Sequence, residues 1–254
     1  MLLHEPPPTP FDLRFRLFGT RVRIHPGYWL IALLLGWGYA QVPRFSQNGL
    51  PELGLWVLAA TFSILLHEFG HVWAGRAFGN KGEILLQSMG GLALGANAGL
   101  SRWSSIAVSL AGPAIQLAFW AALLPAWNSR PSFRSYVVLV LLLEMLWFIN
   151  LYWALLNLLP AWPLDGGQVA RELAVMASPR HGKAISLWLS LILSAALLAN
   201  TLMPALLKKE PLVPALAGSQ DNFLLVLLYA QLAVGSYLEL AKMRGSGRVF
   251  DDPW

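Results

Sequence analysis

Residues 54–75 read GLWVLAATFSILLHEFGHVWAG, and this stretch decides the fold class of the chain. A run of about 20 apolar residues is the length that an α-helix needs to cross a lipid bilayer. Near its end the run carries three ionisable side chains, those of His67, Glu68 and His71. Ionisable groups inside a membrane helix are costly and usually serve a function. We therefore expect this helix to carry the functional site.

The composition of the whole chain agrees with a membrane protein. Of its 254 residues, 12% are charged and 56% are hydrophobic, whereas a typical soluble domain has about 25% charged residues. Apolar segments of membrane-spanning character occupy residues 27–43, 50–78, 103–127, 135–160, 184–207 and 222–241. We predict an all-α polytopic membrane protein with about six transmembrane helices and a short membrane-associated β-hairpin or strand element.

The segment before the first span alternates strictly between apolar and charged residues. This pattern over residues 11–25 predicts a hairpin with its turn at Gly19 and Thr20, one apolar face and one arginine-rich face. The arginine face suits anionic lipid headgroups, although the hairpin can equally pack on its own protein. We divide the chain into an N-terminal tail with an interfacial hairpin (1–26), a transmembrane domain (27–241) and a cytoplasmic C-terminal tail (242–254).

Residues 80–101 contain too many glycines for a helix among their apolar residues. We interpret them as a membrane-associated strand or hairpin. An exposed strand edge can hold an extended peptide by strand addition, so this segment is a candidate for substrate binding. A short interfacial loop that shields a buried site from lipid explains the composition equally well.

The basic residues indicate the topology. The chain has 18 Lys and Arg and a net charge of +5, but these residues are scattered through short connections rather than gathered in one patch, which argues against nucleic acid as a partner. Most of them fall in alternate connections between the spans, so the positive-inside bias places both termini in the cytoplasm. We expect a multi-pass protein of the cell (inner) membrane, with the lipid bilayer as its surroundings. The oligomeric state leaves no signal in the sequence.

The sequence His67-Glu68-Phe69-Gly70-His71 is an H-E-x-x-H motif. Its two histidines, four residues apart, lie on one face of a helix and suit a zinc ion, while Glu68 can act as general base toward a zinc-bound water. The chain has no Cys, so any further ligand must be His or a carboxylate. No His follows at the spacing of the metzincin signature, and the third ligand must therefore come from elsewhere in the chain.

Asp165 is the candidate for that ligand. It is the sole Asp between Asp12 and Asp221 and ends the stretch Pro160-Ala161-Trp162-Pro163-Leu164-Asp165. The two prolines end the fourth span, so we expect Asp165 on irregular chain, which is tolerated at membrane depth only beside protein or a water-filled cavity. The alternative is an ordinary Asp-Gly turn at the membrane surface.

Together these motifs resemble the site-2 proteases, a family of intramembrane zinc metalloproteases. HEFGH at residues 67–71 is similar to the family's H-E-x-x-H, and NLLPAWPLDGG at 157–167 is similar to its N-x-x-P-x-x-x-L-D-G element. The resemblance implies that His67, His71 and Asp165 hold one zinc ion per chain and that Glu68 activates water. Shorter similarities lie in Arg23-Ile24-His25-Pro26, Gly90-Gly91 and Ala111-Gly112-Pro113.

Other polar residues of the spans follow from the same resemblance or depart from it. In the family's pattern the amide of Asn157 donates to the scissile carbonyl or its oxyanion; the alternative is a helix-end cap. Gln116 stands where many members have Asn. We expect Asn150 to be a structural partner and Glu144 to hydrogen-bond across helices with a group such as Gln116. Neither a PDZ-sized insertion nor a nucleotide-binding tail is recognisable, which predicts a minimal member.

The function expected from the sequence is that of an intramembrane zinc endopeptidase that cleaves transmembrane segments of protein or peptide substrates in regulated intramembrane proteolysis. Two other functions stay open. His and Asp in membrane spans also mark ion pathways, as in a zinc or metal-ion transporter. A catalytically silent membrane scaffold is the third, although the intact set of His, Glu and Asp argues against it.

Overall fold

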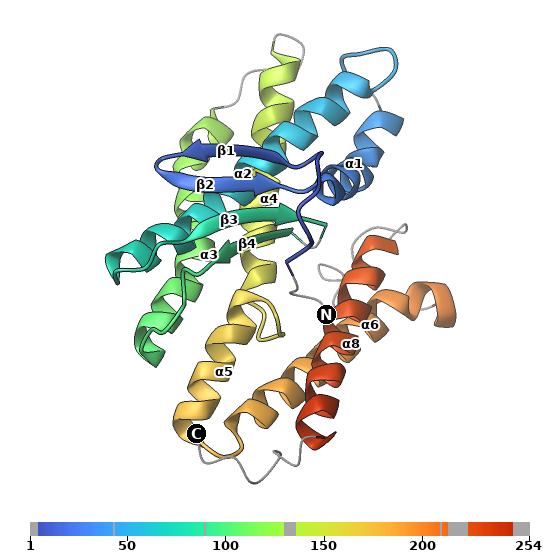
Figure 1. The fold of residues 1–254 in the computed structure, drawn as a ribbon. Helices are drawn as coiled ribbons and strands as arrows, with labels where there is room; N and C mark the ends of the chain where they lie inside the picture. Colours follow the sequence, from blue (N-terminus) through green and yellow to red (C-terminus); the bar gives the residue numbers. More distant parts are fainter. Residues whose placement is uncertain are drawn as a thin grey trace. The chain divides into compact units, whose positions relative to one another are not determined.

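The structure is a computed structural model that describes residues 5–42, 44–88, 90–129, 136–208, 210–212 and 223–245. The chain divides into two compact units, one ending at Asn157 and the other starting at Leu158. Figure 1 labels the helices and strands of both. Five helices of the described residues are long and apolar enough to cross a membrane. The chain is therefore a mostly helical integral membrane protein with a small sheet.

The sheet belongs to the first unit and contains β1 (Leu13–Leu17), β2 (Thr20–Ile24), β3 (Glu83–Gln87) and β4 (Gly90–Leu94) in that spatial order. Strands β1 and β2 form an antiparallel hairpin, as do β3 and β4. The two hairpins join through a parallel pairing of β2 with β3. The expected strand element at residues 80–101 is thus confirmed as a hairpin that extends the N-terminal one.

The N-terminal hairpin has its turn at Phe18 and Gly19, because Leu17 pairs with Thr20. Both turn residues have positive φ angles, the combination that type I′ turns require. The expected turn at Gly19 and Thr20 was therefore wrong by one residue. Thr20 belongs to β2.

One face of this hairpin packs on its own protein. Val22 and Ile24 are buried in a cluster with Phe69 and Val72 of the neighbouring helix and with Ile84 of β3. This arrangement favours packing on the protein for the apolar face.

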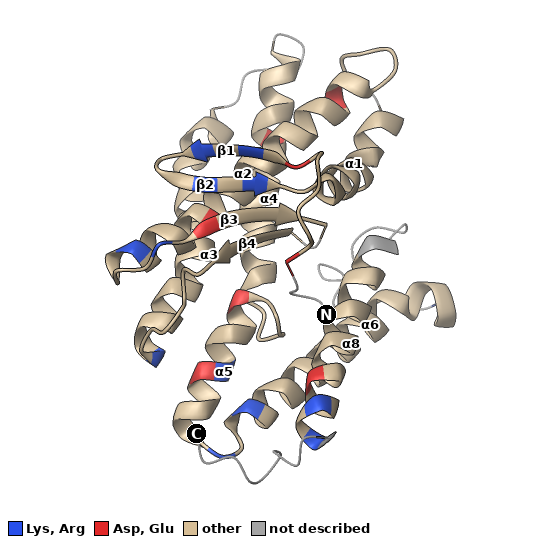
Figure 2. Cartoon of the chain, viewed as in Figure 1, with Lys and Arg blue, Asp and Glu red and all other residues tan. Residues whose placement is uncertain are grey.

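The arginines of the hairpin (Figure 2) alternate with its apolar residues and therefore lie on the opposite face. Most of them form ion pairs within the protein. Arg14 and Arg23 contact Asp12, and Arg21 pairs with Glu83 of β3. Burial alone would raise the pKa of Asp12, but hydrogen bonds from Thr9 and the two guanidinium groups hold it well below its usual range. These ion pairs leave less positive charge for lipid headgroups than the sequence suggested.

Helices α1 (Pro26–Gln41) and α2 (Leu50–Ala77) connect β2 with β3. His25 caps α1, since its Nδ1 accepts a hydrogen bond from the amide of Gly27. Helix α1 has 16 residues and is shorter than the ~20 that a membrane crossing usually takes, so it is not among the five long helices. Because β2 and β3 are neighbours in one sheet, α1 and α2 together return the chain to the side on which it started.

Helices α3 (Arg102–Asn128) and α4 (Val137–Asn157) complete the first unit. Ser101 begins α3 by accepting a hydrogen bond from the amide of Ser104. Helix α4 packs on α2 through a cluster that includes Trp56, Leu141 and Met145. Glycines bring α2 and α3 together, because a Cβ at Gly70 would lie 2.5 Å from the carbonyl oxygen of Ala111. Small residues at helix contacts allow such close approach in membranes.

The second unit contains α5 (Asp165–Ala177), α6 (Gly182–Leu207) and α8 (Phe223–Gly245). Helices α6 and α8 pack against each other, with the Oγ atoms of Ser190 and Ser236 2.6 Å apart and the guanidinium of Arg244 over the ring of Trp188. Helices therefore occupy all six expected spans. Among the described residues, the one helix that the sequence did not predict is α5, which begins at the residue expected on irregular chain.

Candidate metal centre

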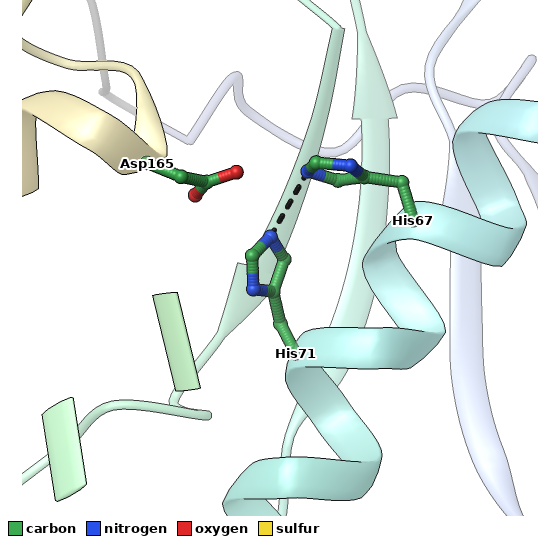
Figure 3. A group of neighbouring side chains, drawn as sticks. All are labelled: His67, His71 and Asp165. Atoms are coloured by element: carbon green, nitrogen blue, oxygen red, sulfur yellow. Dashed lines mark hydrogen bonds between the residues drawn. The ribbon is translucent and has the colours of Figure 1, made fainter. Parts of the chain in front are cut away.

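Helix α2 presents His67 and His71 from consecutive turns (Figure 3), as the four-residue spacing predicted. Both side chains are buried, with exposed fractions of 3% and 7%. Their Nε2 atoms lie 3.0 Å apart, and the two rings are nearly perpendicular. Two nitrogens bound to one tetrahedral zinc ion at ~2.0–2.1 Å are about 3.3 Å apart, so the pair needs only a small adjustment to hold the ion.

The other ring nitrogens face acceptors in α3. His71 Nδ1 lies 2.7 Å from the carbonyl oxygen of Val108, and His67 Nδ1 lies 2.8 Å from Gln116 Oε1. A carbonyl oxygen only accepts hydrogen bonds, so both Nδ1 atoms carry the proton when the rings are neutral. Both Nε2 lone pairs then point into the same space. A cation between them is the natural partner of such a pair, and zinc fits this donor set.

A glycine of α3 keeps that space open. A Cβ at Gly112 would overlap His71 Nε2 and lie 2.9 Å from His67 Nε2. Only a residue without a side chain leaves room for an ion beside both nitrogens. This requirement is a physical reason for the glycine in Ala111-Gly112-Pro113, the segment that is similar to the family pattern.

Glu68 lies beside the histidines on α2 and is buried, with an exposed fraction of 4%. It faces the sheet, because a Cβ at Gly91 of β4 would overlap its carboxylate. The backbone of β4 thus runs directly against the candidate base. The other side of β4 has no strand partner among the described residues. The sequence hinted at this contact only through the Gly90-Gly91 pair.

Asn157, the proposed oxyanion donor, is the last residue of α4. Its Nδ2 donates a hydrogen bond of 3.0 Å to the carbonyl oxygen of Trp153 in the preceding turn. This contact matches the alternative role of a helix-end residue. The Nδ2 group has a second N–H, and the catalytic role of Asn157 stays a prediction.

Asp165 belongs to the second unit and is the first residue of α5. The expected irregular chain precedes it, at residues 158–164, and an acidic residue in the first turn of a helix is favourable for the helix dipole. Asp165 is buried, with 7% of its surface exposed. This burial argues against an ordinary turn at the membrane surface.

The turn before Asp165 folds tightly over the start of α5. A Cβ at Gly167 would lie 2.5 Å from the backbone carbonyl of Ala161, and one at Gly166 would overlap the carbonyl oxygen of Leu158. The amide of Trp162 donates to Ser190 Oγ of α6 at 2.7 Å. Both glycines and this hydrogen bond fix the path of the chain that leads into Asp165.

Two other polar residues have partners that the sequence did not predict. Glu144 forms an ion pair with Arg44 rather than with Gln116, and Gln116 contacts His67. Asn150 is a structural partner as expected, since its Nδ2 donates to Ser63 Oγ across the α2–α4 contact. Pairings between distant helices leave no signal in one sequence, which explains the wrong expectation for Glu144.

Comparison with known proteins assigns this chain to a family. The profile of peptidase family M50 matches residues 133–199. A Synechocystis protein named as a zinc metalloprotease is 34% identical over 175 residues, which are 66% of this chain and 45% of the relative. The chain belongs to the M50 peptidases, the family of the site-2 proteases.

This M50 family member also matches a second sequence relative and a solved structure. The zinc metalloprotease Rip3 of Mycobacterium tuberculosis is 30% identical over 67% of the chain and 44% of the relative. The site-2 protease from Methanocaldococcus jannaschii matches with a TM-score of 0.57 at 22% identity, covering 91% of this chain and 95% of that one. The matched region spans less than half the length of the curated relatives.

Proposed function

We propose that this chain is an intramembrane zinc endopeptidase that cleaves transmembrane segments of membrane proteins. The observation that carries the proposal is the convergence of His67 Nε2 and His71 Nε2 at 3.0 Å on a membrane helix, with Glu68 buried beside them. The names of the relatives, which are zinc metalloproteases, support it.

His67, His71 and Asp165 would hold one zinc ion. All three are buried, and each offers one ligand atom of a type that zinc prefers. Three protein ligands leave a position for water, and the ion would lower the pKa of that water to about 7. Asp165 as third ligand rests on the chemistry of its carboxylate, on its buried place at the start of α5 and on the resemblance of the stretch around it.

Glu68 acts as the general base of the proposed reaction. Its carboxylate accepts a proton from water and passes it to the leaving amine. Its burial against the backbone of β4 keeps it from turning toward bulk solvent. The Nδ2 group of Asn157 serves as a hydrogen-bond donor to the substrate carbonyl oxygen.

The substrate binds in extended form along β4. A helical peptide hides its carbonyl groups in intrahelical hydrogen bonds, and strand addition exposes them. The close approach of Gly91 in β4 to the Glu68 carboxylate supports this mode of binding. We expect Ala93→Pro in β4 to lower cleavage about tenfold with zinc retained, because a strand N–H is lost. Arg16→Pro on β1, the opposite edge, is the matched control; equal cleavage by both variants would contradict strand addition.

We also propose that both termini lie in the cytoplasm of a cell with the protein in its inner membrane. Within the second unit, Lys183 lies near the start of α6, and Lys242 and Arg244 lie near the end of α8. The contact of Arg244 with the ring of Trp188 puts these charges at the same end of the helix pair. This clustering is what the positive-inside bias predicts for a cytoplasmic end.

The decisive experiment compares the unaltered protein with Glu68→Gln in detergent or liposomes. Zinc content is measured by elemental analysis, and cleavage is measured on a co-expressed single-span substrate. We expect Glu68→Gln to retain zinc and to lose cleavage by about 10²–10⁴-fold, since Glu68 is not a ligand but the base. Glu144→Gln, which removes a carboxylate paired with Arg44, is the matched control and should cleave normally.

Other outcomes would decide against the proposal. Full cleavage by Glu68→Gln would show that Glu68 is not the general base. Zinc transport into vesicles by both proteins, without cleavage, would favour a transporter. Zinc bound without cleavage or transport would leave a membrane scaffold.

A further inference from the structure

We propose that Gln116 is a positioning residue that holds His67 in the tautomer and orientation that metal binding requires. The inference rests on the proposed zinc site and gives a role to a residue that lies outside the H-E-x-x-H motif and stands where many family members have Asn. Gln116 lies in α3, across the helix contact from the H-E-x-x-H motif, and its exposed fraction is 0%.

The amide of Gln116 bridges two groups of α2. Its Oε1 lies 2.8 Å from His67 Nδ1, and its Nε2 donates at 3.1 Å to the carbonyl oxygen of Ser63. A carbonyl oxygen only accepts, so the amide nitrogen must face Ser63 and the amide oxygen must face His67. The orientation of the side-chain amide is thus set by the backbone one turn before the histidine.

This orientation determines where the proton of His67 sits. Gln116 Oε1 accepts, so Nδ1 of the neutral ring donates and the lone pair of Nε2 points toward His71. A hydrogen bond at the second nitrogen of a ligating histidine fixes its tautomer and raises its basicity. Without an acceptor at Gln116, the ring would be free to place its proton on Nε2, and it would have to move that proton to Nδ1 before Nε2 could ligate.

The two histidines differ in how they are held. The acceptor for His71 Nδ1 is the backbone carbonyl of Val108, which no side-chain substitution removes. The acceptor for His67 is a side chain. Substitution of Gln116 therefore tests the orientation of one ligand while the other ligand stays fixed.

The test uses two variants of the full chain and one matched control. Gln116→Met keeps length and approximate volume but replaces the amide by a weak acceptor. Gln116→Glu keeps an oxygen acceptor toward His67. Asn150→Leu is the control, because Asn150 is equally buried and contacts the same Ser63, while its amide donates to Ser63 Oγ and to the carbonyl oxygen of Leu146.

Zinc affinity is measured by competition with a chromophoric chelator, and the thermal unfolding of the zinc-free proteins is measured beside it. We expect Gln116→Met to bind zinc about 10–100-fold more weakly, and Gln116→Glu to bind close to the unaltered protein. Asn150→Leu should unfold at a lower temperature yet keep its zinc affinity. Equal affinity of Gln116→Met and the unaltered protein would overturn the proposal, as would equal losses in Gln116→Met and Asn150→Leu.

A second measurement does not depend on the folding of any variant. In the zinc-free protein with ¹⁵N-labelled histidine, we expect His67 to carry its proton on Nδ1; a proton on Nε2 would overturn the proposal. The unaltered protein also separates the two levels of inference. If it fails to bind zinc, the proposed function is wrong, whereas zinc binding that is insensitive to Gln116 contradicts only the positioning role.

Discussion

The histidine-bearing helix of the first unit and the aspartate-bearing turn of the second use glycine in different ways. In α2 and α3, Gly70 and Gly112 let two long helices approach, and the space at Gly112 lies directly beside the histidine nitrogens. In the second unit, Gly166 and Gly167 let a short turn fold onto the helix that it starts. In the proposed site, the first arrangement would keep space for the ion, and the second would position the third ligand. Substitution of a glycine in either region should therefore lower zinc affinity, but for a different reason in each.

The largest effect is expected from Gly112→Ala. The new methyl group would occupy the space beside the two Nε2 atoms, so zinc affinity should fall at least about 100-fold. Alanine is favoured over glycine in a helix by about 1 kcal/mol, which limits damage to α3 itself. Zinc affinity by chelator competition and helix content by circular dichroism measure the two effects.

Gly54→Ala in α2 is the matched control for this variant. A Cβ at Gly54 meets no atom within 4 Å, so the substitution should leave zinc affinity unchanged. A Gly112→Ala protein with normal zinc affinity would contradict the assignment of the space beside His67 and His71 to the metal.

A smaller effect is expected from Gly167→Ala. Its Cβ would meet the backbone of Ala161 and Trp162, and backbone cannot move aside as the end of a side chain can. We expect a loss of stability of about 1–3 kcal/mol from overpacking and a zinc affinity about tenfold lower, because Asp165 shifts while both histidines remain. Thermal unfolding and chelator competition separate these two results.

The control is Gly182→Ala, which places a Cβ against the backbone of Ala174 in the same unit. It should lower stability to a similar extent but leave zinc affinity unaltered, since it lies at the start of α6. If both variants lose stability and neither loses zinc affinity, Asp165 is not the third ligand.

Much of the fold followed from hydrophobic patterning. The apolar runs predicted the positions of α1, α2, α3, α4, α6 and α8 because a membrane segment must be apolar over its whole length. The alternation at residues 11–25 predicted the first hairpin, and the glycines of 80–101 predicted the second. Both patterns are local, and local patterns are visible in one sequence.

The contacts between distant segments were not predictable in this way. The sequence placed His67, Glu68 and His71 together, because four-residue spacing on a helix is local geometry. It suggested that Glu144 would pair with Gln116, whereas the former pairs with Arg44 and the latter with His67. The parallel pairing of β2 with β3 was equally hidden, because it depends on how two helices return the chain.

The short helix α5 shows a third kind of limit. The two prolines before Asp165 indicated that regular structure stops, and the preceding helix α4 does end at Asn157. Gly166 and Gly167 do not favour a helix either, since glycine costs about 1 kcal/mol in a helix relative to alanine. In the structure both glycines lie in the first turn of α5, where the close approach of residues 158 and 161 requires them. Packing outweighed the intrinsic preference.

The parallel pairing of β2 with β3 also sets an order of assembly during synthesis. Val22 of β2 pairs with Ile84 of β3, which follows far later in the sequence. The first hairpin therefore leaves the ribosome before β3 has been synthesised. A hairpin alone forms within about 1–10 μs, but pairing between distant strands is intrinsically slow. Strand β2 must therefore wait until α1 and α2 have been placed. Strand β4, which packs against Glu68 of α2, is added only afterwards. The candidate base therefore acquires its final environment late in biogenesis.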